Sequence, residues 1–153
     1  MQAAQIREIL PKSKIDAELE IPSSKSYTNR ALLIAAIAEG PSRLEKFLSS
    51  EDTEYMRQAL SKFGVGIELA DGAVLVTPAQ RLNYSGNIFV GDAGTAMRFL
   101  TGFCCLNSGE VFLLGNERMR QRPIGDLVSA LKLLIKGSIE AVGENVKGEK
   151  CPP

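Results

Sequence analysis

Apolar and polar positions change period several times along the chain, and each change predicts a new element. Strict alternation predicts strands, whereas an apolar stripe or run of helical length predicts a helix. Strands are expected at 14–21, 42–47, 65–69, 74–77, 87–90, 110–114 and 138–142. Helices are expected from Pro22 to about Glu39, from Ser49 or Ser50 to Gly64, from Gly94 to Leu106 and from Pro123 to about Ile135. The third and fourth strands should form a hairpin around Asp71-Gly72.

The order of these elements repeats, and a short local text repeats with it. Ala59 and Ala130 each begin an Ala-Leu pair with a lysine beside it, 71 positions apart, and Ile67-Glu68 recurs as Ile139-Glu140 after 72. Such a repeat indicates duplication of a β-α-β-α-β-β unit in an α/β fold. We therefore expect a first unit at 14–78 and a second, incomplete unit at 87–142.

Residues 143–153 read GENVKGEKCPP, which is polar and offers no further strand. The tail is expected to be disordered, or the chain has been cut short. Truncation is favoured, because an absent last strand would leave an open sheet edge.

Charge and composition exclude several kinds of partner. Eighteen basic residues balance eighteen acidic ones, so no overall field favours nucleic acid or an anionic membrane, and recognition of an anion must be local. The 44% hydrophobic content is that of an ordinary globular domain. With no apolar run of about 20 residues and no signal-peptide core, a cytoplasmic location is expected.

The chain has no histidine and three cysteines, which limits its chemistry to Lys, Arg, Asp and Glu. Cys104 and Cys105 are adjacent in an apolar helical stretch and are expected to be buried thiols, whereas Cys151 lies near the C-terminus, where the chain is expected to fray. An odd number without ligand-like spacing predicts neither a disulfide framework nor a metal site. No cofactor is expected.

Three predicted helices begin beside cations. The first begins within PSSKSYTNR, which contains Lys25 and Arg30. The second begins within GDAGT, with Asp92, Gly94, Thr95 and Arg98 at its mouth, and the third follows Arg118, Arg120 and Arg122. A cation in the first turn opposes the helix dipole by about 0.3–1 kcal/mol, whereas an anion is stabilised there. The set therefore predicts a ligand with at least two anionic groups.

Each feature also has a plainer interpretation. Ser24 or Ser26 can serve as an ordinary N-cap, Arg30 and Arg98 can pair with surface acids, and Gly94 can simply permit a tight turn. Arg118 and Arg120 are interpreted as solvated loop charges. Neither a Walker A motif nor GxGxxG is present, so nucleotide binding is not indicated.

Three motifs, in order and at family-like spacing, make the chain resemble one family. PSSKSYTNRALL, GDAGTAMR and RMRQRPIGDLVSAL resemble the 3-phosphoshikimate 1-carboxyvinyltransferase (EPSP synthase) family, over about 15–140 and only its N-terminal third. The resemblance implies the enolpyruvyl transferase fold, an inside-out α/β barrel also found in RNA 3′-terminal phosphate cyclases. It would place residues 1–13 in a second domain that is otherwise absent, and it implies a cytoplasmic, monomeric full-length enzyme.

The implied reaction transfers the enolpyruvyl group of phosphoenolpyruvate to the 5-hydroxyl of shikimate 3-phosphate, on the route to chorismate and aromatic amino acids. Carried over by motif position, Lys25 would be catalytic and contact both substrates. Ser26 and Arg30 would hold shikimate 3-phosphate, while Gly94 and Arg122 would hold phosphoenolpyruvate. The positions of Asp92, Thr95 and Arg98 would line the same pocket.

Two positions depart from the family, and other functions stay open. Asp92 stands where the family commonly has Asn, and Phe99 stands where many members have Pro. The related UDP-N-acetylglucosamine enolpyruvyl transferases usually carry a cysteine in the loop before the matching Arg-Pro, and NERMRQRP has none. A third possibility is an anion-binding fragment without turnover, because the family's acid/base residues would lie outside this chain.

Overall fold

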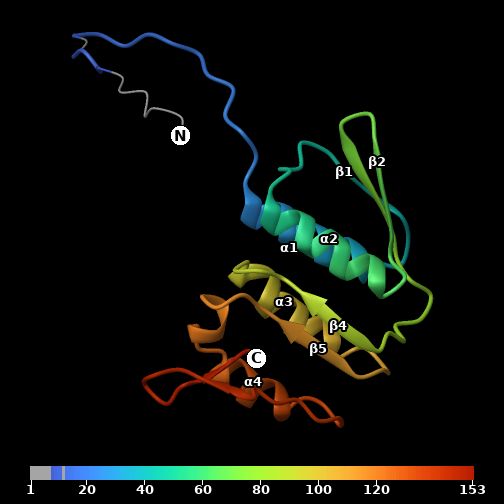
Figure 1. The fold of residues 1–153 in the computed structure, drawn as a ribbon. Coiled ribbons are helices and arrows are strands. Elements are labelled where there is room, and N and C mark those ends of the chain that lie inside the picture. The colour runs from blue at the N-terminus through green and yellow to red at the C-terminus, as the bar shows by residue number, and fades with distance from the viewer. Residues whose placement is uncertain (1–7, 12) are drawn as a thin grey trace, which may run out of the picture.

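The computed structural model describes residues 8–11 and 13–153, which form helices and short strands in nearly the predicted order (Figure 1). The helices are α1 (Lys25–Ala36), α2 (Glu51–Lys62), α3 (Gly94–Cys104) and α4 (Gly125–Lys132), with a 3₁₀ turn η1 (Met119–Gln121). The strands are β1 (Ser42–Leu44), β2 (Gly66–Ala70), β3 (Ala73–Thr77), β4 (Gly86–Phe89), β5 (Val111–Leu114), β6 (Gly143–Glu144) and β7 (Lys150–Cys151).

Helix α2 begins and ends where its sequence chemistry predicts. Ser50 is the N-cap, and a capping box joins it to Thr53, whose backbone N–H donates to the Ser50 hydroxyl at 3.4 Å. In return, the Ser50 N–H donates to the Thr53 hydroxyl at 2.9 Å. Gly64 follows the helix with a φ of 85°, which favours glycine. The cap stabilises a helix that begins with three acids and therefore suits its own dipole.

The predicted hairpin around Asp71-Gly72 is confirmed. Both turn residues have positive φ, 50° and 72°, as a two-residue type I′ turn requires. Strand β3 pairs antiparallel with β2 on one edge and with β1 on the other, so the sheet order is β1-β3-β2.

Strands β4 and β5 form a parallel pair, and α3 makes the crossover between them. Helix α3 packs against α1 and α2, which lie side by side in Figure 1. Leu32, Met56, Leu60, Met97 and Leu100 from these three helices are fully buried in one core. Burial of each such side chain stabilises the fold by about 1.5–3 kcal/mol, and the core fixes the spacing of the helix entrances.

The strand expected at 14–21 is wrong in this structure. The segment is extended but unpaired, and Figure 1 shows it running away from the helices. Its alternating apolar side chains, Ile15, Leu19 and Ile21, are 84, 80 and 81% exposed. Alternation produces a strand only where a sheet edge accepts it, and no strand of the described residues pairs with this segment.

The C-terminal region also differs from expectation. Residues 138–142 form no strand, whereas 143–153, expected to be disordered, contain the antiparallel pair β6–β7. Cys151 is fully buried rather than frayed. The tail is ordered because it docks on the start of α4, where the Ile124 N–H donates to the Lys150 carbonyl at 2.9 Å.

Several boundaries shift by a few residues. Pro123 lies before α4 rather than in its first turn, since Arg122 is extended, as a residue before proline prefers. Helix α1 ends at Ala36 and α4 at Lys132, both earlier than expected. Cys104 and Cys105 are only half-buried. The placement of 1–13 in another domain falls largely on residues outside the described ones, and the unit boundaries 14–78 and 87–142 stay predictions.

Candidate functional site

The entrance of α1 carries a cation that α2 balances. Ser24 is the N-cap and accepts a hydrogen bond from the Tyr27 N–H at 3.4 Å, so its plainer interpretation holds. The first turn of α1 contains no acid, and its first residue is Lys25. The Lys25 ammonium lies 3.0 Å from the Asp52 carboxylate in the first turn of α2. The sequence motifs gave no indication of this ion pair.

Arg30 extends from α1 towards α3. Its guanidinium donates to the Ser26 carbonyl at 3.0 Å and lies 5.3 Å from the centre of the Phe99 ring. Phe99 therefore provides a cation–π surface on which Arg30 is held. Within the described part of the chain Arg30 forms no ion pair, so its interpretation as a salt-bridge partner is wrong here.

The entrance of α3 is built from backbone without a side-chain cap. The chain leaves β4 through Gly91, whose φ is 55° and where a Cβ would lie 2.7 Å from the Tyr55 ring. Ala93 is the N-cap and makes no side-chain hydrogen bond, and the first turn has no acid. Amide N–H groups at such a start are unpaired and favour an anion.

Gly94 and Arg122 are in direct contact at this entrance. A Cβ on Gly94 would lie 2.5–2.6 Å from three atoms of the Arg122 guanidinium. The same guanidinium donates to the Asp92 carbonyl at 3.0 Å. The two residues assigned to one substrate by resemblance are thus brought together from segments 28 positions apart, and Gly94 is required for this approach.

Arg98 holds the backbone around Arg122. Its guanidinium donates to the Pro123 carbonyl at 2.8 Å and to the Gly94 carbonyl at 3.3 Å. It forms no ion pair among the described residues, so the alternative of a surface salt bridge is wrong for Arg98 as well. Thr95 follows Gly94 in the first turn and is half-buried.

The three arginines before Pro123 do not form an entrance to α4. They lie around η1, and α4 starts at Gly125 with Asp126 in its first turn. Arg122 serves the α3 entrance instead. Arg118 is not a free loop charge, because it reaches the Asp92 carboxylate at 3.4 Å. Arg120 is exposed, as its plainer interpretation expects.

The described residues thus form two adjacent cationic groups. Lys25, Ser26 and Arg30 lie on α1, while Asp92, Gly94, Arg98 and Arg122 surround the start of α3. The contact of Arg30 with Phe99 and the packing of α1 on α3 join them. Such an arrangement can hold two anionic groups, because arginine forks bind phosphate and carboxylate in a fixed orientation.

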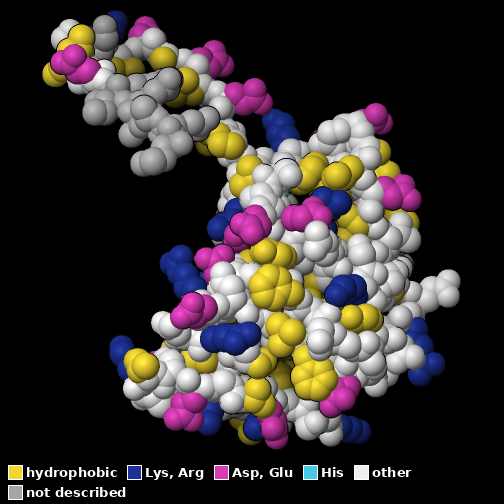
Figure 2. Space-filling view, in the orientation of Figure 1, with side chains coloured by type: hydrophobic (Ala, Val, Ile, Leu, Met, Phe, Trp, Pro, Cys, Tyr) yellow, Lys and Arg dark blue, Asp and Glu magenta, His cyan; other side chains and the backbone are white. Residues whose placement is uncertain are grey.

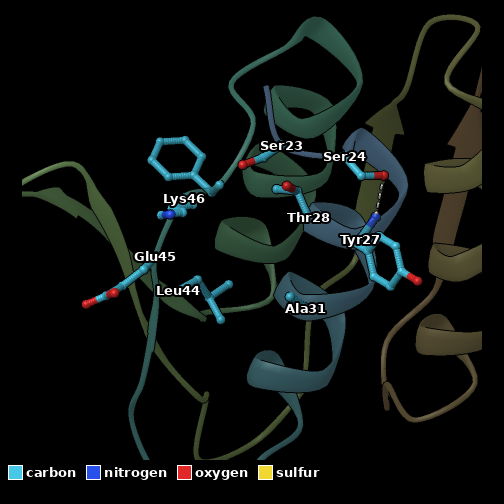
Figure 3. A pocket seen from close by; sticks show the side chains of 9 residues that line it. Ser23, Ser24, Tyr27, Thr28, Ala31, Leu44, Glu45 and Lys46 are labelled. Atoms are coloured by element: carbon cyan, nitrogen blue, oxygen red, sulfur yellow. Dashed lines mark hydrogen bonds between the residues drawn. The ribbon is translucent and has the colours of Figure 1, made fainter. Parts of the chain in front are cut away.

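Two hollows of the surface lie beside these cations rather than among them. One of about 260 Å³ lies between the start of α1 and the segment after β1. Figure 3 shows the hydroxyls of Ser23 and Thr28 near its middle and the Glu45 carboxylate pointing away. Neither Lys25 nor Arg122 lines it. On the face drawn in Figure 2, Lys and Arg side chains are dispersed among Asp and Glu side chains.

Within 8–11 and 13–153, no group of three or more His, Cys, Asp or Glu side chains is placed to hold a metal ion. In the same part of the chain, no helix has the length and apolar character needed to cross a membrane.

Comparison with known proteins identifies the family. The family model described as EPSP synthase (3-phosphoshikimate 1-carboxyvinyltransferase) matches residues 9–147. The chain is 43% identical over 148 residues to the 3-phosphoshikimate 1-carboxyvinyltransferase of Vibrio vulnificus, which covers 94% of the chain and 33% of that relative. With the Rhizobium etli enzyme it shares 43% over 155 residues, covering 99% and 35%.

A solved EPSP synthase from Acinetobacter baumannii superposes with a TM-score of 0.69 at 28% identity, over 88% of this chain and 30% of that one. This similarity confirms the predicted α/β class. The chain spans about one third of the length of the curated relatives it matches. The match over 9–147 confirms the resemblance seen in the three motifs: the chain belongs to the EPSP synthase (3-phosphoshikimate 1-carboxyvinyltransferase) family.

Proposed function

We propose that the chain provides one anion-binding wall of a 3-phosphoshikimate 1-carboxyvinyltransferase. The observation that carries the proposal is the contact of the Arg122 guanidinium with Gly94 at the uncapped start of α3. A phosphoenolpyruvate group placed there would meet unpaired amide N–H groups and a fixed arginine. Lys25, Ser26 and Arg30 on the neighbouring helix would hold shikimate 3-phosphate, with Lys25 reaching both substrates.

The reaction forms a C–O bond between the 5-hydroxyl oxygen and C2 of phosphoenolpyruvate, while C3 gains a proton and the hydroxyl loses one. The tetrahedral intermediate then releases phosphate, and C3 loses a proton to restore the double bond. Cations on the wall would orient both anionic reactants and stabilise the intermediate, because their geometry is fixed before binding. Asp92, Thr95 and Arg98 would border the same pocket.

For the 153-residue chain by itself, we propose substrate binding without ordinary turnover. Its described site residues supply charge and orientation, and the acid/base residues are assigned to other parts of the full-length enzyme. A steady-state assay with both substrates checks this. Turnover within the usual enzyme range of about 1–1,000 per second would contradict it.

The binding proposal is tested by nuclear magnetic resonance titration of the chain with phosphoenolpyruvate and with shikimate 3-phosphate. Arg122→Met should weaken phosphoenolpyruvate binding about tenfold or more, and Lys25→Met should weaken both, because each removes a charge-assisted contact. Arg120→Met and Lys132→Met are the matched controls, since both lie exposed. Equal affinity of Arg122→Met and Arg120→Met would refute the assignment.

The proposal includes a cytoplasmic location and a monomeric full-length enzyme. Sedimentation of a full-length version would check the oligomeric state. In the same full-length version, Lys25→Met or Arg122→Met should raise the Michaelis constants or lower the turnover.

A further inference from the structure

The mouth of α3 contains a carboxylate that opposes anion binding. Asp92 lies two residues before Gly94, and its backbone carbonyl accepts a hydrogen bond from the Arg122 guanidinium at 3.0 Å. Its side chain is therefore close to the place where the proposed substrate would carry its negative charge. A like charge near an anion site lowers affinity unless a cation compensates it.

Other carboxylates add to this negative charge. Tyr55 contacts Gly91, and its pKa is raised by a hydrogen bond to Glu51 and by burial, with further contributions from the charges of Glu51, Asp92 and Asp52. The Tyr55 hydroxyl therefore lies in the negative field of three carboxylates, two on α2 and one at the α3 entrance. Asp52 is paired with Lys25, 3.0 Å away. Of the three carboxylates, Asp92 is the nearest to Gly94 in the sequence.

Arg118 is the cation that faces Asp92. Its guanidinium lies 3.4 Å from the Asp92 carboxylate, although the arginine side chain is 79% exposed. An ion pair with this exposure contributes about 0–1 kcal/mol to folding, so the pair does little to stabilise the protein. Its larger effect is electrostatic, because it cancels a charge beside the anion site.

We propose that Arg118 raises the affinity for anions at the α3 entrance by neutralising Asp92, without itself touching the ligand. The inference rests on the proposed function, which places a phosphorylated carboxylate against Gly94 and Arg122. Arg118 thereby compensates for the carboxylate at position 92. The pair Asp92–Arg118 functions as a unit, because Asp92 holds the exposed Arg118 side chain beside the site and Arg118 would extend into solvent without it.

A double-mutant cycle tests the unit, with phosphoenolpyruvate titrated into the 153-residue chain and the Gly94 amide followed by magnetic resonance. Arg118→Ala should weaken binding about fivefold, the size expected for one unscreened charge about 4 Å away in water. In an Asp92→Asn background the same substitution should change affinity less than about twofold. Arg118→Lys should bind as the unmodified chain does, because it keeps the charge.

Arg120→Ala is the matched control, since it removes the same charge from an exposed arginine two residues away that makes no ion pair within the described residues. Raising the ionic strength to about 1 M, where the screening length falls to about 3 Å, should shrink the effect of Arg118→Ala. Equal weakening in both Asp92 backgrounds would overturn the inference in favour of direct contact between Arg118 and the ligand. Equal effects of Arg118→Ala and Arg120→Ala would also overturn it, because they would show that only the net charge of the chain matters.

If the proposed function itself is wrong, the titrations give a different pattern. If the unmodified chain does not bind phosphoenolpyruvate, or if Arg122→Met leaves binding unchanged, the α3 entrance is not the anion site and the inference falls with it. If binding depends on Arg122 but shows no coupling between Asp92 and Arg118, the proposed function stands and only this inference is wrong.

Discussion

Gly94→Ala should displace the Arg122 guanidinium while leaving the stability of the fold almost unchanged. The added Cβ would lie 2.5–2.6 Å from the guanidinium, against about 3.4 Å or more for ordinary contacts, so the guanidinium must move by about 1 Å. It is the far end of a flexible side chain and can move without disturbing the core. We therefore expect the free energy of unfolding to change by less than about 0.5 kcal/mol, since alanine also favours a helix.

Anion binding should respond much more strongly. The 3.0 Å hydrogen bond from Arg122 to the Asp92 carbonyl is then exchanged for one to water, and the guanidinium leaves the place where it would meet the anion. The charge-assisted hydrogen bond that it would make to the anion is worth about 1.5–3 kcal/mol, which corresponds to roughly ten- to a hundredfold in affinity. Phosphoenolpyruvate titration followed by magnetic resonance measures the affinity, and thermal unfolding followed by circular dichroism measures stability.

Gly102→Ala is the control in the same helix, because a Cβ there meets nothing within 4 Å. It should leave affinity unchanged and stabilise α3 by up to about 1 kcal/mol. If Gly94→Ala weakens binding as much in an Arg122→Met background as alone, the effect does not pass through Arg122 and the reasoning fails.

Two further predictions concern stability. Ser50→Ala removes the side chain that caps α2 and should destabilise the fold by about 1 kcal/mol in thermal unfolding, whereas Ser49→Ala should have little effect; equal losses would show that the capping box contributes nothing. Burial, with a smaller contribution from Cys105, raises the pKa of Cys104 from 9.0 to about 12. Because the folded state keeps this proton longer than the unfolded state, stability should fall between about pH 9 and 12. A Cys104→Ala variant should lose that part of the decline in chemical denaturation, and an unchanged pH dependence would contradict the assignment.

Features set by local chemistry could be predicted from the sequence. Ser50 with its following acids specifies the start of α2, and Asp71-Gly72 specifies the hairpin turn, because each uses neighbours a few residues apart. The strand at 14–21 failed for the opposite reason. Its pattern says which face could be buried but not whether a partner edge exists.

The candidate site divides in the same way. The motifs indicated Gly94 and Arg122, but their contact depends on how η1 turns the chain back towards α3. The partners Asp52 and Arg118 were missed because each ion pair joins residues 26 or more positions apart. Nothing in the local pattern of either residue indicates its partner.

The C-terminal hairpin affects more than the end of the chain. Asn145 donates to the Gln121 carbonyl at 3.2 Å, and the Ile124 N–H donates to the Lys150 carbonyl at 2.9 Å. With Arg98 on the Pro123 carbonyl, the peptide before Arg122 and the Pro123–Ile124 peptide are held from outside their own segment. An arginine preorganised in this way loses little conformational entropy when an anion arrives. In the proposed site, the last residues of the chain would therefore contribute to binding by reducing the entropy that the substrate must otherwise offset.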